Sequence, residues 1–341
     1  MHGTLTAQVC CANEVGNMKE LSGVSPIPLP SALPGERVEL DTPAGRVSFY
    51  RSMAGGAGPG RQLPPLILIH SVNAAGSAAE MRPVFERCRA NRPVYAIDLP
   101  GFGFSERSVR RYTPRLMTDA VHALVAIARG DHQGVAVDAM ALSLGCEFLA
   151  RDAQEAPDAY RSIALVSPTG FRGVKARLGP PGSVVGSERV HSVLAWAGWR
   201  RGLYGLLTRR GVIRYFLERT WGSKQIDELL LDYDFATARQ PGAEHAPLCF
   251  LSALLFSDDA MRLYESLRMP VWLIHGIRGD FVDYRQKQRF ALSPNWTMDV
   301  LPTGALPYFE EAAAFFSRYD AFLKHSGLTP ETEPVRTARA G

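Results

Sequence analysis

The chain has 341 residues, of which 46% are hydrophobic and 21% are charged, and its formal net charge is +4 at pH 7. This composition is typical of a globular protein with a large core, and the charge is too small to indicate nucleic acid as a partner. No signal region and no apolar run near the ~20 residues of a membrane span is seen, so we expect a cytoplasmic protein. The cysteines form no C-x-x-C pair or metal-ligand spacing, which favours a reducing compartment and predicts neither metal nor cofactor: Cys10, Cys11, Cys88, Cys146 and Cys249.

Strand-like and helix-like segments alternate through most of the chain. Residues 1–35 end in a proline-rich stretch that cannot sustain a helix, and we expect them to form a flexible lead. A hairpin then opens the fold, and the predicted strands lie at residues 36–40, 46–51, 65–70, 93–98, 162–167, 271–276 and 296–301, with one more that runs into Ser143. Helical segments separate most of them, at residues 76–90, 114–129 and 144–155. This alternation predicts a mostly parallel sheet covered by helices on both faces.

Ser143 lies in the most informative stretch of the chain. An apolar run ends at this serine, the small residues Ala141 and Gly145 lie two positions to either side, and a helix-like segment follows at once. A strand that turns abruptly into a helix leaves the serine hydroxyl exposed at the carboxyl edge of the sheet, and only small neighbours permit the turn. The pattern A-x-S-x-G therefore predicts a nucleophile elbow, with the helix N-terminus placed to stabilise an oxyanion.

Three further motifs accompany this serine. The apolar residues 66–69 lead into His70-Ser71, residues 98–105 read D-x-x-G-x-G-x-S, and residues 276–280 read G-x-x-x-D. Together with the serine turn, these motifs resemble the α/β-hydrolase family in order and separation from about residue 36 to about residue 325. The resemblance implies an eight-stranded, mostly parallel sheet whose second strand is antiparallel to the rest. The core would comprise residues 36–170 and 266–326, followed by a disordered tail at 327–341.

Residues 171–265 interrupt the alternation with helical patterns alone, at the point where the α/β-hydrolase family carries a helical cap. From residue 172 to 224 eleven basic residues face two acidic ones, and from residue 225 to 265 eight acidic residues face two basic ones. We expect these two stretches to pair their charged faces. The alternative is a cationic rim that attracts anionic acyl substrates or rests on a membrane surface. Tryptophans would assist it, although at this spacing they more often pack inside a cap: Trp196, Trp199 and Trp221.

The resemblance also implies roles for particular residues. Ser143 would be the nucleophile, Asp280 would be the acid of the triad, and Asp283 is the second choice for that acid. The backbone N–H groups of Leu144 and Val72 would form the oxyanion hole, because the hole needs one donor from each side of the carbonyl group.

The histidine of the triad is missing from its expected place. The family pattern G-H-x-P-x-x-E falls on residues 304–310, where Gly304, Pro307 and Glu310 match and Ala305 occupies the histidine position. His70, at the end of a strand, and His245, within the predicted cap, are the candidates for a substitute base. In serine hydrolases the loss of the base costs on the order of 10⁴ to 10⁶ in turnover, so this position decides the function.

Three functions remain open from the sequence. The first is a hydrolase of a small hydrophobic ester, thioester or related acyl compound, with a degraded triad or a base supplied from elsewhere. The second is a catalytically lapsed protein that binds a ligand or a partner under the cap. The third is a lyase or isomerase that needs only the oxyanion hole. Retention of the serine turn and of Asp280 favours the first. The oligomeric state is not determined by these patterns.

Overall fold

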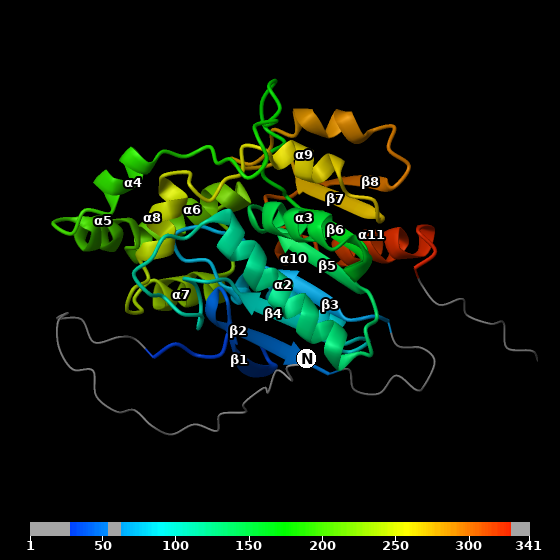
Figure 1. Ribbon diagram of the computed structural model, residues 1–341, viewed down its shortest axis with the longest axis horizontal. Coiled ribbons are helices and arrows are strands. Elements are labelled where there is room, and N and C mark those ends of the chain that lie inside the picture. Colours follow the sequence, from blue (N-terminus) through cyan, green and yellow to red (C-terminus); the bar gives the residue numbers. More distant parts are fainter. Residues whose placement is uncertain (1–27, 54–62, 329–341) are drawn as a thin grey trace, which may run out of the picture.

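The computed structural model describes residues 28–53 and 63–328. Most of the predicted lead, up to residue 27, and of the predicted tail, from residue 329, lies outside the described residues. One sheet of eight strands runs through the described chain, with the spatial order β1-β2-β4-β3-β5-β6-β7-β8 (Figure 1). The strands are β1 (Glu36–Thr42), β2 (Gly45–Ser52), β3 (Leu66–Ile69), β4 (Val94–Asp98), β5 (Val137–Leu142), β6 (Tyr160–Val166), β7 (Val271–Gly276) and β8 (Trp296–Leu301).

Strand direction follows the expected pattern. β2 pairs antiparallel with both β1 and β4, and every pair from β4 to β8 is parallel. The central strands are apolar because they are buried on both faces, as strands of a parallel sheet between helices must be. Ile67 and Ile69 of β3 point into one core layer, and Leu66 and Leu68 point into the other. The predicted mostly parallel, eight-stranded sheet is therefore confirmed.

Helices cover both faces of the sheet. One core layer contains side chains of α2 (Pro114–Asp131), α3 (Gly145–Glu155) and α9 (Ala260–Glu265). The other contains side chains of α1 (Arg82–Cys88) and α11 (Ala312–His325), and of the short α10 (Pro307–Glu310). Three 3₁₀ turns complete the core: η1 (Ala78–Met81), η2 (Pro157–Ala159) and η3 (Arg285–Phe290). Among the described residues, no helix combines the length and the apolar character that crossing a membrane would require.

Between β6 and β7 the chain carries a series of helices, here called the insertion, and most of them lie together at one side of the sheet in Figure 1. These are α4 (Glu188–Leu194), α5 (Arg200–Leu207), α6 (Arg210–Trp221), α7 (Glu228–Thr237) and α8 (His245–Leu251), and α9 closes the segment. The uneven charge is explained in part by ion pairs between α6 and α7, which join Arg210 to Asp232 and Arg214 to Glu228.

The three tryptophans of the insertion differ in exposure. Trp221 is buried, as packing inside a cap requires, whereas Trp196 and Trp199 are 56% and 47% exposed. The expectation that all three pack inside is therefore wrong for two of them. The reason is that α4 contributes no buried residue, so the chain between α4 and α5 has little protein surface to pack against.

Candidate active site

Ser143 follows β5 directly and adopts a positive φ of 52°, a conformation that L-residues rarely take. Its backbone N–H donates to the Val166 carbonyl oxygen at 2.9 Å, which fixes the turn against β6. A Cβ atom at Gly145 would lie 2.5 Å from the carbonyl oxygen of His70, so only glycine fits where α3 passes the end of β3. The geometry is the strained strand-to-helix turn that the A-x-S-x-G pattern predicts.

Two backbone donors adjoin this turn. Leu144 caps the N-terminus of α3, and Val72 follows the end of β3. Within residues 28–53 and 63–328, neither the Leu144 N–H nor the Val72 N–H donates a hydrogen bond to another group. Buried N–H groups are rarely left without an acceptor, so this pair is available for an oxyanion, and the α3 dipole favours negative charge there.

A cavity of about 130 Å³, here called the Ser143 cavity, brings several of these residues together. Its lining includes Ser143, Leu144, Val72 and Ala305, so the predicted nucleophile, both predicted oxyanion donors and the predicted histidine position share one space. The wall is mainly apolar, and part of it comes from the insertion, through Leu217, Leu230 and Phe250. A cavity of ~150 Å³ with such a wall accepts benzene, so this one suits a small hydrophobic group.

His70 does not line the Ser143 cavity, and both of its ring nitrogens are engaged by the backbone. Nε2 accepts from the Leu99 N–H at 2.9 Å, and Nδ1 donates to the Ser71 carbonyl oxygen at 2.5 Å. The ring is fully buried, and this burial lowers the pKa of His70 to about 4. The sequence offered it as a substitute base, but the geometry makes it a neutral brace between the ends of β3 and β4.

His245 is the first residue of α8 and likewise does not line the Ser143 cavity. Its Nε2 lies 3.8 Å from Glu244 Oε1. Burial lowers the pKa of His245, and the nearby Arg200 and Arg201 lower it further. The structure thus brings neither candidate histidine together with Ser143.

Asp280, the predicted acid, follows β7 but pairs with the insertion. Its carboxylate accepts two hydrogen bonds from the Arg219 guanidinium, at 2.5 and 2.8 Å, and its side chain is 41% exposed. It lines a neighbouring cavity of about 510 Å³, which shares Ser167 and Phe281 with the Ser143 cavity. The Asp280 carboxylate is therefore paired with Arg219, and its role as the triad acid stays a prediction.

Asp283, the second choice for the acid, also has other partners. It accepts hydrogen bonds from the Arg285 guanidinium and from the Gly173 N–H. The Arg285 hydrogen bond holds the pKa of Asp283 well below its usual range. Asp283 lines the neighbouring 510 Å³ cavity and not the Ser143 cavity.

Glu80 also lines the Ser143 cavity, and no motif of the sequence predicted a role for it. Its Oε2 accepts from the Ser71 N–H at 2.7 Å, and its Oε1 accepts from Ser71 Oγ at 2.9 Å and from Asn73 Nδ2 at 2.7 Å. Burial raises the pKa of Glu80, and these hydrogen bonds oppose the rise. The one local sequence signal is Ser71, directly after His70, because its N–H and hydroxyl are two of the donors that hold Glu80.

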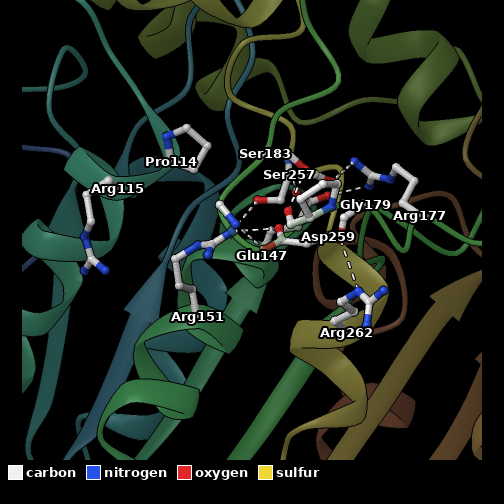
Figure 2. A network of polar contacts seen from close by, with 12 residues as sticks. Pro114, Arg115, Glu147, Arg151, Arg177, Gly179, Ser183, Ser257, Asp259 and Arg262 are labelled. Atoms are coloured by element: carbon white, nitrogen blue, oxygen red, sulfur yellow. Dashed lines mark hydrogen bonds and ion pairs between the residues drawn. The ribbon is translucent and has the colours of Figure 1, made fainter.

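Behind the serine turn, a buried polar network fixes the insertion to α3 (Figure 2). Glu147 accepts from Arg177 at 2.5 Å and from the Ser257 N–H at 2.7 Å. One helical turn further on, Arg151 donates to Asp259 at 2.8 Å. The network joins residues from both ends of the insertion to the helix that begins just after Ser143, so it positions the walls of the cavity relative to the serine.

Comparison with known proteins agrees with this architecture. The model of the alpha/beta hydrolase family matches residues 66–318. A probable hydrolytic enzyme from Pseudomonas aeruginosa PAO1 is similar in structure, with a TM-score of 0.65, 20% identity, and coverage of 86% of this chain and 96% of that chain. A thermophilic esterase from Thermogutta terrifontis is similar with a TM-score of 0.62, 16% identity, and coverage of 85% and 99%.

A meta-cleavage product hydrolase from Pseudomonas fluorescens IP01 has a TM-score of 0.60, 17% identity, and coverage of 84% of this chain and 97% of that chain. At these identities the structural likeness establishes the fold alone. Among curated proteins, no sequence match was found. The family match covers well over half of the chain, and the sheet order, the serine turn and the insertion agree with it. The chain therefore belongs to the alpha/beta hydrolase family.

Proposed function

We propose that this protein is a serine hydrolase that cleaves a small hydrophobic ester, thioester or related acyl compound. The observation that carries the proposal is the placement of Ser143 in a strained turn, in one apolar cavity with Leu144 and Val72, whose N–H groups have no acceptor among the described residues. A strained serine costs stability, of order 1–3 kcal/mol, and such strain is most often found at functional sites.

In this mechanism the Ser143 hydroxyl attacks the acyl carbon, and the N–H groups of Leu144 and Val72 stabilise the oxyanion. An acyl-enzyme forms and water then hydrolyses it. The insertion would act as a cap, because Leu217, Leu230 and Phe250 close the cavity and would exclude water from the reacting group. The neighbouring 510 Å³ cavity would leave room for the alcohol or thiol portion of the substrate.

The solved structures support the reaction class, since those reported above are named as an esterase, a meta-cleavage product hydrolase and a probable hydrolytic enzyme. A cytoplasmic setting is proposed from the cysteines, because Cys88, Cys146 and Cys249 are free, buried thiols.

The test is intact-mass labelling with a fluorophosphonate, which reacts only with an activated serine. Wild type should gain one adduct, and Ser143→Ala should gain none. Peptide mapping should place the adduct on Ser143 rather than on Ser167, which also lines the cavity and has a φ of 47°. An unlabelled wild type that also fails to turn over short-chain p-nitrophenyl esters would remove the proposal.

A second function, a catalytically lapsed ligand-binding protein, is favoured by one observation. Among the described residues no histidine lines the Ser143 cavity, and Asp280 is paired with Arg219. On this alternative the folded protein would bind short-chain acyl compounds in a calorimeter without hydrolysing them, and Ser143→Ala would bind equally well.

A further inference from the structure

We infer that Glu80 is the general base of the Ser143 site and replaces the histidine that the chain lacks at Ala305. The inference deepens the proposed function and rests on it. Among the residues that line the Ser143 cavity, Glu80 is the one with an ionisable acid or base in its side chain. A base must reach the serine proton directly or through one water molecule, and only a group that faces this cavity meets that requirement.

The hydrogen bonds of Glu80 orient its carboxylate and leave it one open position. A carboxylate has about four acceptor sites, two on each oxygen. Oε1 accepts from Ser71 Oγ and from Asn73 Nδ2, whereas Oε2 accepts only from the Ser71 N–H. The remaining acceptor site is therefore on Oε2. Three donors from one loop hold the group in a single orientation, as an effective base needs to be held.

The groups around Glu80 do not reduce the basicity of its carboxylate through an ion pair. The titratable or charged groups on the elements that pack around it are His70 at the end of β3, Asp98 of β4, Arg82 of α1, Asp234 of α7 and Tyr308 of α10. Arg82 is the one cation among these groups, because the buried His70 is neutral, and its guanidinium lies 4.0 Å from Asp227. In the described part of the chain no guanidinium or ammonium group donates to the Glu80 carboxylate, so no ion pair there neutralises its negative charge.

Asp234, on the neighbouring α7, is a second buried carboxyl group and differs from Glu80 in its hydrogen bonds. It is buried, and its Oδ1 has no hydrogen-bond partner in the described chain. Burial raises the pKa of Asp234 well above its ordinary value, and the charge of Glu80 raises it further. Burial without a hydrogen-bond partner disfavours the charged form of Asp234, whereas three donors favour the charged form of Glu80.

The proposed reaction has two stages, the formation of an acyl-enzyme and its hydrolysis. The Ser143 O–H proton passes to Glu80 Oε2 as Oγ bonds to the acyl carbon, and the carbonyl electron pair moves to the oxyanion held by Leu144 and Val72. Collapse of this intermediate breaks the bond to the leaving group, which takes the proton from Glu80. Water then attacks the acyl-enzyme and gives a proton to Glu80, and that proton returns to Ser143 Oγ as the acyl bond to the serine breaks.

Glu80 could instead only hold the Val72 loop through Ser71, and a pH profile separates the two roles. For p-nitrophenyl butyrate, kcat/KM of wild type should rise with pH as Glu80 loses its proton. Glu80→Gln should lower it by at least about a hundredfold and remove that dependence. Ser71→Ala keeps the carboxylate but removes a hydrogen bond that lowers its pKa, so the rise should move to higher pH. A purely positioning role predicts loss in both variants with an unshifted profile.

A double variant shows whether a Glu80→Gln protein that has lost activity is still folded. Placing an imidazole at the predicted histidine position should restore a base that is independent of Glu80, so Glu80→Gln with Ala305→His should exceed Glu80→Gln alone by at least about tenfold. If wild type is active and Glu80→Gln matches it, the role of Glu80 is wrong and the proposed function stands. If wild type is neither labelled by fluorophosphonate nor active, both are wrong.

Discussion

At the scale of single residues, the carboxyl edge of the sheet contains serines with a strained backbone and a buried histidine whose charged form is disfavoured. Ser143 and Ser167 each follow a parallel strand with positive φ, at 52° and 47°. His70 is kept neutral between two backbone hydrogen bonds. Glycine would adopt the backbone conformation of Ser143 at lower cost. For Ser143 this cost is consistent with a requirement for its hydroxyl.

The strain at Ser143 predicts a gain in stability when the side chain is removed. Ser143→Gly should raise the free energy of unfolding by about 1 kcal/mol, because glycine adopts positive φ without the Cβ clash. Ser143→Ala keeps the Cβ atom and should stay within about 0.5 kcal/mol of wild type. Urea unfolding of the three proteins measures both values, and a Ser143→Gly protein no more stable than Ser143→Ala would contradict the argument.

The lowered pKa of His70 leads us to expect that the stability of the protein depends on pH in a specific way. Its pKa is about 4 in the folded protein, against an ordinary value of 6.5, so the unfolded chain takes up a proton first as the pH falls. The contribution of the neutral His70 ring to the free energy of unfolding is therefore complete above pH 6.5. It falls by roughly 3 kcal/mol as the pH drops to about 4.

Unfolding curves between pH 7.5 and pH 4 test this effect. His70→Gln should lack that part of the loss, since an amide oxygen can accept from the Leu99 N–H without titrating. His325→Gln, at an exposed position in α11, serves as the control and should follow wild type. Parallel pH profiles for His70→Gln and wild type would rule out a buried neutral imidazole.

At the scale of elements, α3 connects the nucleophile to the insertion. Its first turn provides the Leu144 N–H, and its next residues provide Glu147 and Arg151, which hold both ends of the insertion (Figure 2). Glu147 is fully buried and Arg177 is 21% exposed at the side chain, so this pair lies in a region where water screens it poorly.

Breaking one partner of this buried pair should be costly. Arg177→Met should destabilise the protein by about 3 kcal/mol or more, because the Glu147 carboxylate stays buried without its cation. Adding Glu147→Gln should recover part of the loss, which a double-mutant cycle of unfolding free energies measures. Arg289→Met breaks the exposed pair with Glu265 and should cost less than about 1 kcal/mol. Equal effects of Arg177→Met and Arg289→Met would contradict the role given to the network.

At the scale of the whole molecule, the Ser143 cavity exists only where the core and the insertion meet. The core contributes the serine turn and the β3 loop, and the insertion contributes Leu217 from α6 and Leu230 from α7. The volume of about 130 Å³ therefore depends on how the two parts are packed, and under the proposed function it would hold an acyl group of a few carbons.

This packing predicts how substrate length will respond to the wall. Leu217→Ala removes three carbon atoms from the cavity wall, so the preferred p-nitrophenyl ester should become about two to three carbons longer in the acyl chain. Leu206→Ala, at a position in α5 that is 50% exposed, should leave the profile unchanged. The comparison is made on kcat/KM over a series of chain lengths, and an unchanged optimum in Leu217→Ala would exclude this cavity as the acyl pocket.

Much of the fold could be predicted from the sequence because its signals are local. β5 and β6 are recognisable as short, mainly apolar runs, since a strand buried on both faces consists mostly of apolar residues. The turn at Ser143 is recognisable because only small residues tolerate the close approach, which Gly145 makes to the His70 carbonyl oxygen. These features depend on residues that are neighbours in the chain.

The chemistry of the site depends instead on residues that are distant in the chain. Asp280 meets Arg219 across 61 positions, and His70 meets the Leu99 N–H across 29, so no local pattern could show that both are occupied. Local patterns were enough to predict the sheet, the serine turn and the absence of a histidine at 305. The place of Glu80 in the cavity wall follows from the folded chain alone, because burial and hydrogen bonding set the environment of a carboxylate and both arise from packing.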